Sequence, residues 1–215
     1  TQVPTTDASA YQAYLQARDE LRRDGTGRAS LFRSQALLDR AVAEDPDFAL
    51  AQATLARVHT FTHWFGYDTD PRRLQQASDA LDAALGADPN LAEAHLALGL
   101  YRAAGFRDYI GALAAYQQAE LRQPGAADIK HYMASAHRRL GQWEAAVSMM
   151  QSAVTSDPEN LSLLADFAGL LRGLRRYEEA APLYQRLAAL DPDDPFKRID
   201  HAMFIVESRG DTAPL

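Results

Sequence analysis

Apolar and small side chains recur along this chain at helical spacing, and Asp-Pro pairs separate the helical segments. The pairs are Asp45-Pro46, Asp88-Pro89, Asp157-Pro158 and Asp191-Pro192, and Pro124 falls in the same series. From Pro89 onward the prolines recur with a period of roughly 34 residues, and the first interval is longer. Because the residue before a proline is kept out of the helical region, each of these points ends a helix. The pattern therefore predicts repeated helical hairpins.

A polar residue shortly after each proline is expected to start the next helix. Its side chain supplies an acceptor or a negative charge for the free N–H groups of the first turn. These residues are Asp47, Asn90, Asp128, Asn160 and Asp194.

Within three adjacent units, residues of fixed type recur at fixed offsets. A large residue precedes a small one at Leu98-Gly99, Met133-Ala134 and Phe167-Ala168. An aromatic residue, an alanine and a second large residue follow at Tyr109, Ala112 and Tyr116, at Trp143, Ala146 and Met150, and at Tyr177, Ala180 and Tyr184. This succession resembles the tetratricopeptide repeat (TPR) family.

Each recurring residue type has a packing reason. Small residues are expected where the two helices of a hairpin cross, since only small side chains let the backbones approach closely. The large residues then fill the space between hairpins. Gly141 is expected to turn the chain between two helices with a positive φ.

The resemblance implies an all-α fold, a right-handed TPR superhelix (α-α solenoid) of helical hairpins with a C-terminal capping helix. The expected divisions are 1–7 linker, 8–46 TPR 1 (divergent), 47–89 TPR 2 (with an insertion at 61–71), 90–124 TPR 3, 125–158 TPR 4, 159–192 TPR 5, 193–209 capping helix and 210–215 tail. Trp64, Phe65 and Tyr67 make the insertion aromatic. We expect it to be ordered and at least partly buried, against the groove, the neighbouring hairpin or a second copy of the chain.

Charge and composition narrow the classes of function. The formal net charge of −7 repels phosphates, so no nucleic acid is expected to bind this segment. Cysteine is absent, which excludes disulfides and Cys-based zinc sites. No apolar run of about 18 residues occurs, so no membrane contact is expected. A cytoplasmic location is expected, or a periplasmic one if the array follows a transmembrane segment outside this sequence.

The first residues bear on the context of the array. Residues 1–6 are polar and typical of a linker, so we expect a piece of a longer protein or a processed form. Residues 10–18 carry a second, weaker resemblance, to the first helix of TPR arrays attached to bacterial signalling effectors such as winged-helix regulators, nucleotide cyclases or protein kinases.

Candidate catalytic chemistry is sparse. His59 and His63 have the i, i+4 spacing of zinc ligands, but no Glu stands between them as in a metalloprotease motif, and no third ligand is evident. Burial under the aromatic insertion is their expected role. No phosphate-cradling glycine-rich loop, nucleophile elbow or paired-carboxylate motif occurs. We therefore expect no enzyme, no cofactor and no metal.

The first helix of each hairpin is expected to line the concave face of the array. Residues seven, eleven and fourteen positions after each proline would point into this groove. The candidate binding residues are Arg57, Leu96, Leu100, His131, Ser135, Arg138 and Arg172. Inward arginines on an acidic protein favour a ligand with acidic or carboxylate groups beside an apolar residue, unless they only solvate the face. The Lys and Asn pattern with which some family members clamp a chaperone C-terminus is missing here.

These features predict a non-catalytic protein- or peptide-binding scaffold module of a larger regulatory or assembly protein. Its ligand would lie in the concave groove. The alternative is a module that senses a small acidic ligand and controls an attached effector domain, such as a transcription regulator, a cyclase or a kinase.

Overall fold

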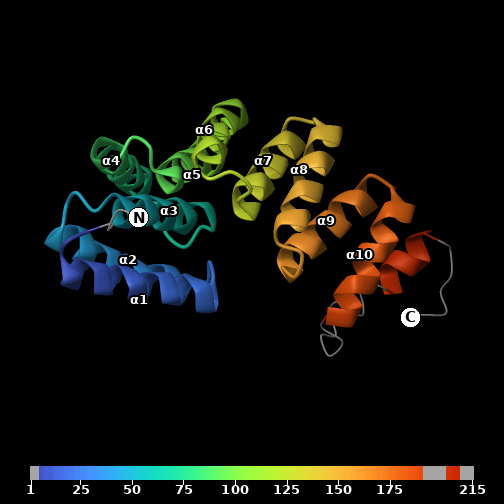
Figure 1. The fold of residues 1–215 in the computed structure, drawn as a ribbon, viewed down its shortest axis with the longest axis horizontal. Helices are drawn as coiled ribbons and strands as arrows, with labels where there is room; N and C mark the ends of the chain where they lie inside the picture. Colours follow the sequence, from blue (N-terminus) through green and yellow to red (C-terminus); the bar gives the residue numbers. More distant parts are fainter. Residues whose placement is uncertain (1–4, 191–201, 209–215) are drawn as a thin grey trace. The chain divides into compact units, whose positions relative to one another are not determined.

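The computed structural model describes residues 5–190 and 202–208, and every regular element within these ranges is a helix (Figure 1). The chain divides into two compact units, Thr1–Pro124 and Gly125–Leu215, called here the N-terminal unit and the C-terminal unit. Over the same ranges, no helix is both long and apolar enough to cross a lipid bilayer.

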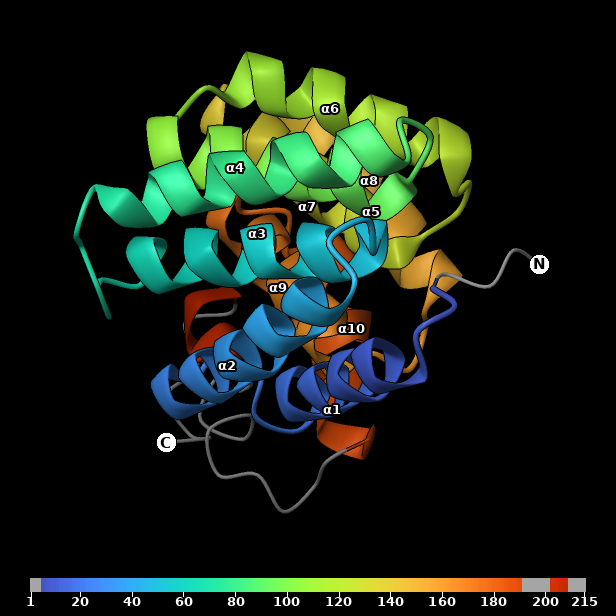
Figure 2. The same ribbon diagram turned by 90° about the vertical axis from the view of Figure 1, so that its left-hand side faces the viewer.

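The N-terminal unit is built from three helical hairpins. Its helices are α1 (Ala8–Asp24), α2 (Arg28–Glu44), α3 (Ala49–Trp64), α4 (Arg72–Ala87), α5 (Ala92–Leu100), the π-helical segment η1 (Tyr101–Gly105) and α6 (Tyr109–Arg122). The two helices of each hairpin pack along each other, and α3 also packs on α2 and α5, so that the hairpins stack in chain order (Figure 2). Apolar side chains from successive hairpins form the core, among them Leu31, Leu38, Phe48, Leu55 and Val58.

The C-terminal unit contains two hairpins and a further helical stretch. Its helices are α7 (Ala127–Arg139), α8 (Trp143–Ser156), α9 (Leu161–Gly173) and α10 (Tyr177–Leu190). Residues 202–208 are helical as well. The Phe204 ring stacks on Tyr184 with centroids 4.6 Å apart and meets Tyr177 edge-on at 6.1 Å. These residues therefore cover α10, in the place expected of a cap.

Helices that precede a proline end as predicted. Asp45, Asp88 and Asp157 have φ values of −138°, −141° and −137°, outside the helical region, directly before their prolines. The N–H of each still donates to the carbonyl four residues back. Gln123 does the same before Pro124.

The predicted helix-start residues are partly confirmed. Asn160 caps α9, because its Oδ1 accepts the N–H of Leu163 at 3.2 Å. Asp128 lies in the first turn of α7, where its negative charge favours the helix start. Asp194 lies outside the described residues.

The same prediction is wrong for Asp47 and Asn90. Their own N–H groups donate to the carboxylates of Asp45 and Asp88, at 3.1 and 2.9 Å. The aspartates of the Asp-Pro pairs thus hold the turn after the proline, and α3 and α5 begin without a side-chain cap.

Small residues occupy the hairpin crossings, as predicted. At most 2% of the side-chain surface is exposed at Ala112, Ala134, Ala146, Ala168 and Ala180. At Gly99 the approach is closer still, since a Cβ there would overlap the ring of Tyr116 on the second helix of its hairpin.

A residue in the left-handed backbone region stands at the turn of each of the last three hairpins. Arg107, Gly141 and Arg175 have φ values of 56°, 73° and 59°. Their spacing equals the repeat period of roughly 34 residues, so the same turn recurs in each hairpin. Gly141 was predicted there. The other two positions hold arginine, whose Cβ makes this region cost about 1–2 kcal/mol.

The aromatic insertion is divided between α3, which continues to Trp64, and a short turn before α4. Thr62 is fully buried, and Tyr67 packs on the core of the N-terminal unit. The rings of Phe61, Phe65 and Tyr67 follow one another with centroids 5.9 and 5.8 Å apart. The segment is therefore partly buried as expected, but Trp64 and Phe65 are 43% and 44% exposed because they lie at and beyond the end of α3.

Part of the predicted linker belongs to the first hairpin. The Thr5 hydroxyl donates to the Asp45 carboxylate, and the Asp7 carboxylate caps α1 by accepting the N–H of Ala10. The rest of the linker (1–4), the start of the predicted capping helix (193–201), its last residue (209) and the predicted tail (210–215) lie outside the described residues.

Candidate ligand-binding site

A pocket open to solvent lies in the C-terminal unit, where side chains of α7, α8 and α9 meet, and we call it the α7–α9 pocket. The residues that line it are His131, Ala134, Ser135, Arg138, Met150, Asp166 and Leu170. Ala134, Met150 and Leu170 are at most 9% exposed and form an apolar floor. The other four bring polar groups to the rim.

Side chains of α7, α8 and α9 meet at this pocket. His131 Nε2 and Asp166 Oδ2 are 2.9 Å apart, joining the first half of α7 to the middle of α9. Toward the other end, Arg138 of α7 and Leu170 of α9 share the lining. Both side chains of the His131–Asp166 pair keep exposed surface, 30% and 56%, so the pair is open to solvent.

Arg138 is the cation of the pocket that no carboxylate holds. It stands one residue before the end of α7, where the partial negative charge of the helix terminus favours a cation. Its side chain is exposed. Within residues 5–190 and 202–208 it forms no ion pair and no side-chain hydrogen bond. Its guanidinium is therefore available to an anion.

Three of the seven predicted binding residues, His131, Ser135 and Arg138, meet in this pocket. Arg172 does not line it, because its Nε lies 3.7 Å from Glu207 Oε2 in the helical stretch that covers α10. The expectation that Arg138 and Arg172 grip one acidic group together thus has no support in the geometry.

Asp166 and Leu170 line the pocket but were not predicted. They lie eight and twelve positions after Pro158, one residue beyond the seven and eleven used to define the groove. On a helix, residues one position apart differ by about 100°, and a broad inward stripe includes both. A wider stripe would have found them.

The other predicted residues, Arg57, Leu96 and Leu100, belong to the N-terminal unit. Leu96 and Leu100 are each 4% exposed. The expectation that they form an apolar groove floor for a ligand is corrected here, since helix packing leaves them almost no free surface. Arg57 is half-buried on α3.

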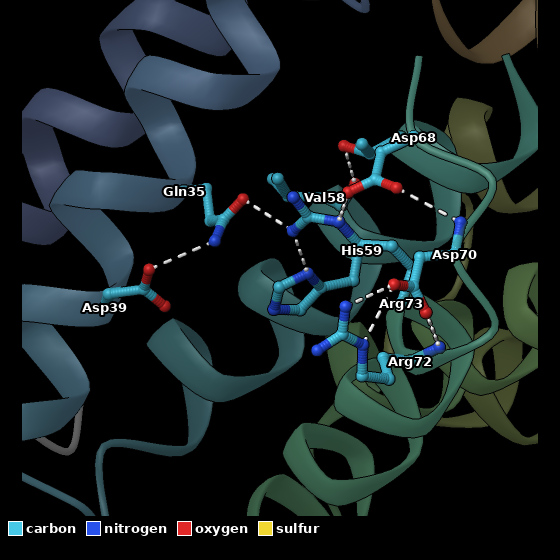
Figure 3. A network of polar contacts seen from close by, with 9 residues as sticks. Gln35, Asp39, Val58, His59, Asp68, Asp70, Arg72 and Arg73 are labelled. Atoms are coloured by element: carbon cyan, nitrogen blue, oxygen red, sulfur yellow. Dashed lines mark hydrogen bonds and ion pairs between the residues drawn. The ribbon is translucent and has the colours of Figure 1, made fainter. Parts of the chain in front are cut away.

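A second cluster of polar side chains lies in the N-terminal unit around Arg73 (Figure 3). Arg73 Nε donates to Asp68 Oδ2 at 2.7 Å, and its Nη1 donates to Gln35 Oε1 at 2.7 Å. The same Nη1 lies 3.1 Å from His59 Nδ1. Its guanidinium also lies 5.6 Å from the ring centroid of Phe32. Arg73 therefore links α4 to α2, α3 and the α3–α4 turn. Its side chain and those of Gln35, His59 and Asp68 contact one another.

His59 is buried, as expected, and is only 3% exposed. Burial, and then the neighbouring Arg73 cation, lowers the pKa of His59 to about 4. The ring stays neutral near pH 7 and accepts at Nδ1 from Arg73. In the described part of the chain no three His, Asp or Glu side chains gather where they could hold a metal ion.

Comparisons with known proteins agree with this architecture. Two models of the tetratricopeptide repeat match the chain, over residues 101–160 and 138–196. No curated protein matches it in sequence.

Solved structures with the same fold include a thermophilic TPR protein of Thermus thermophilus, with a TM-score of 0.73 at 17% identity over 92% of this chain and 99% of that one. PilW, a type IV pilus biogenesis factor, has a TM-score of 0.70 at 14% identity over 97% and 89% of the two chains. YrrB, a TPR protein with an unusual peptide-binding site, has 0.56 at 18% identity over 80% and 84%.

The predicted fold class, an all-α TPR solenoid of helical hairpins, is confirmed by these likenesses. Together with the recurring turns, the two matched models identify residues 101–196 as tetratricopeptide repeats.

Proposed function

We propose that this chain is a non-catalytic scaffold module of a larger regulatory or assembly protein, and that it holds an acidic peptide segment of a partner in the α7–α9 pocket. The observation that carries the proposal is the position of Arg138, which lines the pocket without a carboxylate partner in the described structure. YrrB, a TPR protein with an unusual peptide-binding site, adds support by analogy of fold.

The pocket offers complementary contacts to such a segment. The planar guanidinium of Arg138 can hold a carboxylate through two parallel hydrogen bonds, which the point charge of a lysine cannot do. The Ser135 hydroxyl beside it can donate or accept one more. The apolar floor of Ala134, Met150 and Leu170 fits a small or medium apolar side chain next to the acidic group.

The pocket also contains the residue types of a Ser-His-Asp triad, so catalysis needs a separate argument. A serine nucleophile is activated by a hydrogen bond to its histidine. In the described structure His131 bonds Asp166, and no hydrogen bond joins Ser135 to His131. We therefore assign these three side chains to binding. Ester hydrolysis by the chain that Ser135→Ala abolished would contradict this assignment.

Removal of the Arg138 charge tests the binding proposal. We expect Arg138→Ala to weaken binding of fluorescein-labelled peptides with a Glu-Leu pair in a Gly-Ser background. The loss should be roughly fivefold, because an exposed charge-assisted contact contributes about 1 kcal/mol. Fluorescence anisotropy measures the Kd, and the dependence on NaCl should be flatter for the variant.

Arg139→Ala is the matched control, because Arg139 is the next residue, is equally charged and exposed, and does not line the pocket. Equal losses from the two variants would place the ligand elsewhere. If free succinate or glutamate displaced the peptides at their own Kd, the sensing of a small acidic molecule would replace peptide binding as the function of this pocket.

A further inference from the structure

We infer that the exposed face of α6 is a docking surface for a second copy of this chain, and that two α6 helices pack there antiparallel across a twofold axis. The face consists of Ile110, Ala114, Gln117 and Leu121, called here the α6 stripe, and all four residues are exposed. It belongs to the N-terminal unit, so the inference does not depend on the ligand proposed for the α7–α9 pocket.

The α6 stripe leaves much apolar surface in water. Ile110 and Leu121 are 73% and 72% exposed, more than any other large apolar side chain that the structure describes. Positions i, i+4, i+7 and i+11 of a helix lie on one face, so both side chains share a face with Ala114 and Gln117. No charged residue occurs in 109–119. Another surface can therefore cover this face without burying a charge at its centre.

The neighbouring hairpins show that repeat packing does not require an apolar stripe at these positions. When the crossing alanines Ala77, Ala112 and Ala146 are aligned, the α6 stripe corresponds on α4 to Gln75, Asp79, Asp82 and Gly86, and on α8 to Glu144, Ser148, Gln151 and Thr155. All eight are exposed, although α4 packs on α5 and α8 packs on α9. The stripe positions thus take no part in packing one hairpin on the next, and the apolar residues on α6 are available to a contact outside the chain.

The spacing of the α6 stripe fits a second copy of the same stripe. Its residues are separated by 4, 3 and 4 positions, a series that is the same in both directions. In an antiparallel pair whose twofold axis passes between Ala114 and Gln117, Ile110 of one copy therefore faces Leu121 of the other. Ala114 faces Gln117 near the axis, where the small side chain lets the helices approach. Such a self-complementary patch is what a twofold interface requires.

Charge favours the antiparallel direction. Asp108 caps the N-terminus of α6, where its carboxylate accepts the N–H of Gly111 at 2.9 Å. Arg122 ends the helix and donates at 2.8 Å to two oxygens of Gln118, which are uncharged. Antiparallel pairing brings Asp108 of one copy near Arg122 of the other and opposes the two helix dipoles. Parallel pairing would place like charges together at both ends.

Sedimentation equilibrium of the unmodified chain tests the inference. We expect a reversible dimer with a Kd in the micromolar range, because one helix from each copy makes a small interface. Ile110→Glu combined with Leu121→Thr installs the residues that α8 has at the equivalent positions. This double variant should raise the Kd by about tenfold or more without lowering the Tm. Trp64→Gln is the matched control, because it removes an exposed apolar side chain outside α6 and should leave the Kd unchanged.

The direction of pairing can be tested separately, because the chain contains no cysteine. A mixture of Ile110→Cys and Leu121→Cys chains, oxidised with diamide, should form the mixed disulfide dimer much faster than either variant forms a dimer alone. Fast cross-linking of each variant with itself would contradict the antiparallel arrangement. A chain that stays monomeric at several hundred micromolar, or a dimer that the double variant leaves intact, would overturn the inference. Neither result would affect the α7–α9 pocket.

Discussion

At the residue scale, burial turns the imidazole of His59 from a titrating group into a fixed neutral acceptor. Its Nδ1 faces a guanidinium that also serves Gln35 and Asp68. A proton on His59 would remove this acceptor and place two cations next to each other. The sequence predicted the burial of His59 from its place beside the aromatic insertion. It could not predict Arg73 as the partner, because Arg73 lies beyond a turn whose path depends on tertiary packing.

This environment predicts a pH dependence of stability. The pKa of His59 is about 4 in the folded chain and near 6.5 when unfolded. Between these values the unfolded chain binds a proton that the folded chain does not, so stability falls as pH falls through this window and is fully present above it. The loss should reach up to about 3 kcal/mol at pH 4.

Urea unfolding at several pH values measures this slope. His59→Gln, which keeps an acceptor for Arg73 and cannot titrate, should flatten the curve between pH 4.5 and 6.5. An identical slope in the variant would show that other groups cause the acid sensitivity.

At the scale of the helices, the sequence was most informative where one residue type decides a boundary or a crossing. The prolines marked where helices end, and the small residues marked where hairpins cross. The continuation of α3 to Trp64 and the π-helical segment η1 were not predicted. A glycine lies near each, Gly66 after α3 and Gly105 at the end of η1, but it does not specify how far a helix continues or that a turn is π-helical.

Overpacking tests the hairpin crossings. Ala134→Leu and Ala168→Leu should each destabilise the chain by about 1–3 kcal/mol, since both alanines are at most 2% exposed between two backbones. Ala165→Leu is the matched control, because Ala165 lies on the exposed side of α9 and should tolerate the larger side chain. Three equally small changes in the free energy of unfolding would contradict this packing.

Helical periodicity predicted some of the residues that line the α7–α9 pocket, but not all of them. Periodicity selects the inward face of a helix, which is why the predicted residues include His131, Ser135 and Arg138, and these three line the α7–α9 pocket. Whether an inward side chain is free depends on neighbours distant in sequence. Leu96 and Leu100 are buried by helix packing. Arg172 is paired with Glu207.

At the scale of the whole molecule, each unit has a core of its own. In repeat proteins, stability is a sum of local terms and neighbour contacts, so damage to one hairpin stays mainly within the neighbours it touches. Ala168→Leu should therefore speed amide hydrogen exchange in α7–α10, by a factor of ten for every about 1.4 kcal/mol of stability lost.

The amides of α1–α4 are the internal control in the same experiment. They should exchange at almost unchanged rates, as followed by mass spectrometry of peptide fragments. A uniform acceleration along the chain would indicate one cooperative folding unit instead.

The constant spacing of the left-handed turn residue makes the later hairpins structurally equivalent. From Arg107 to Gly141 and from Gly141 to Arg175, the chain returns to the same backbone state after one repeat period. A gene duplication of residues 125–158 would insert one complete hairpin and rejoin the chain at equivalent points. Gly66 precedes Arg107 by more than one period, so a duplication begun there would copy an irregular connection as well. Duplication of a whole repeat would therefore preserve the repeat geometry in the later hairpins. In the earlier hairpins it would also copy the irregular connection.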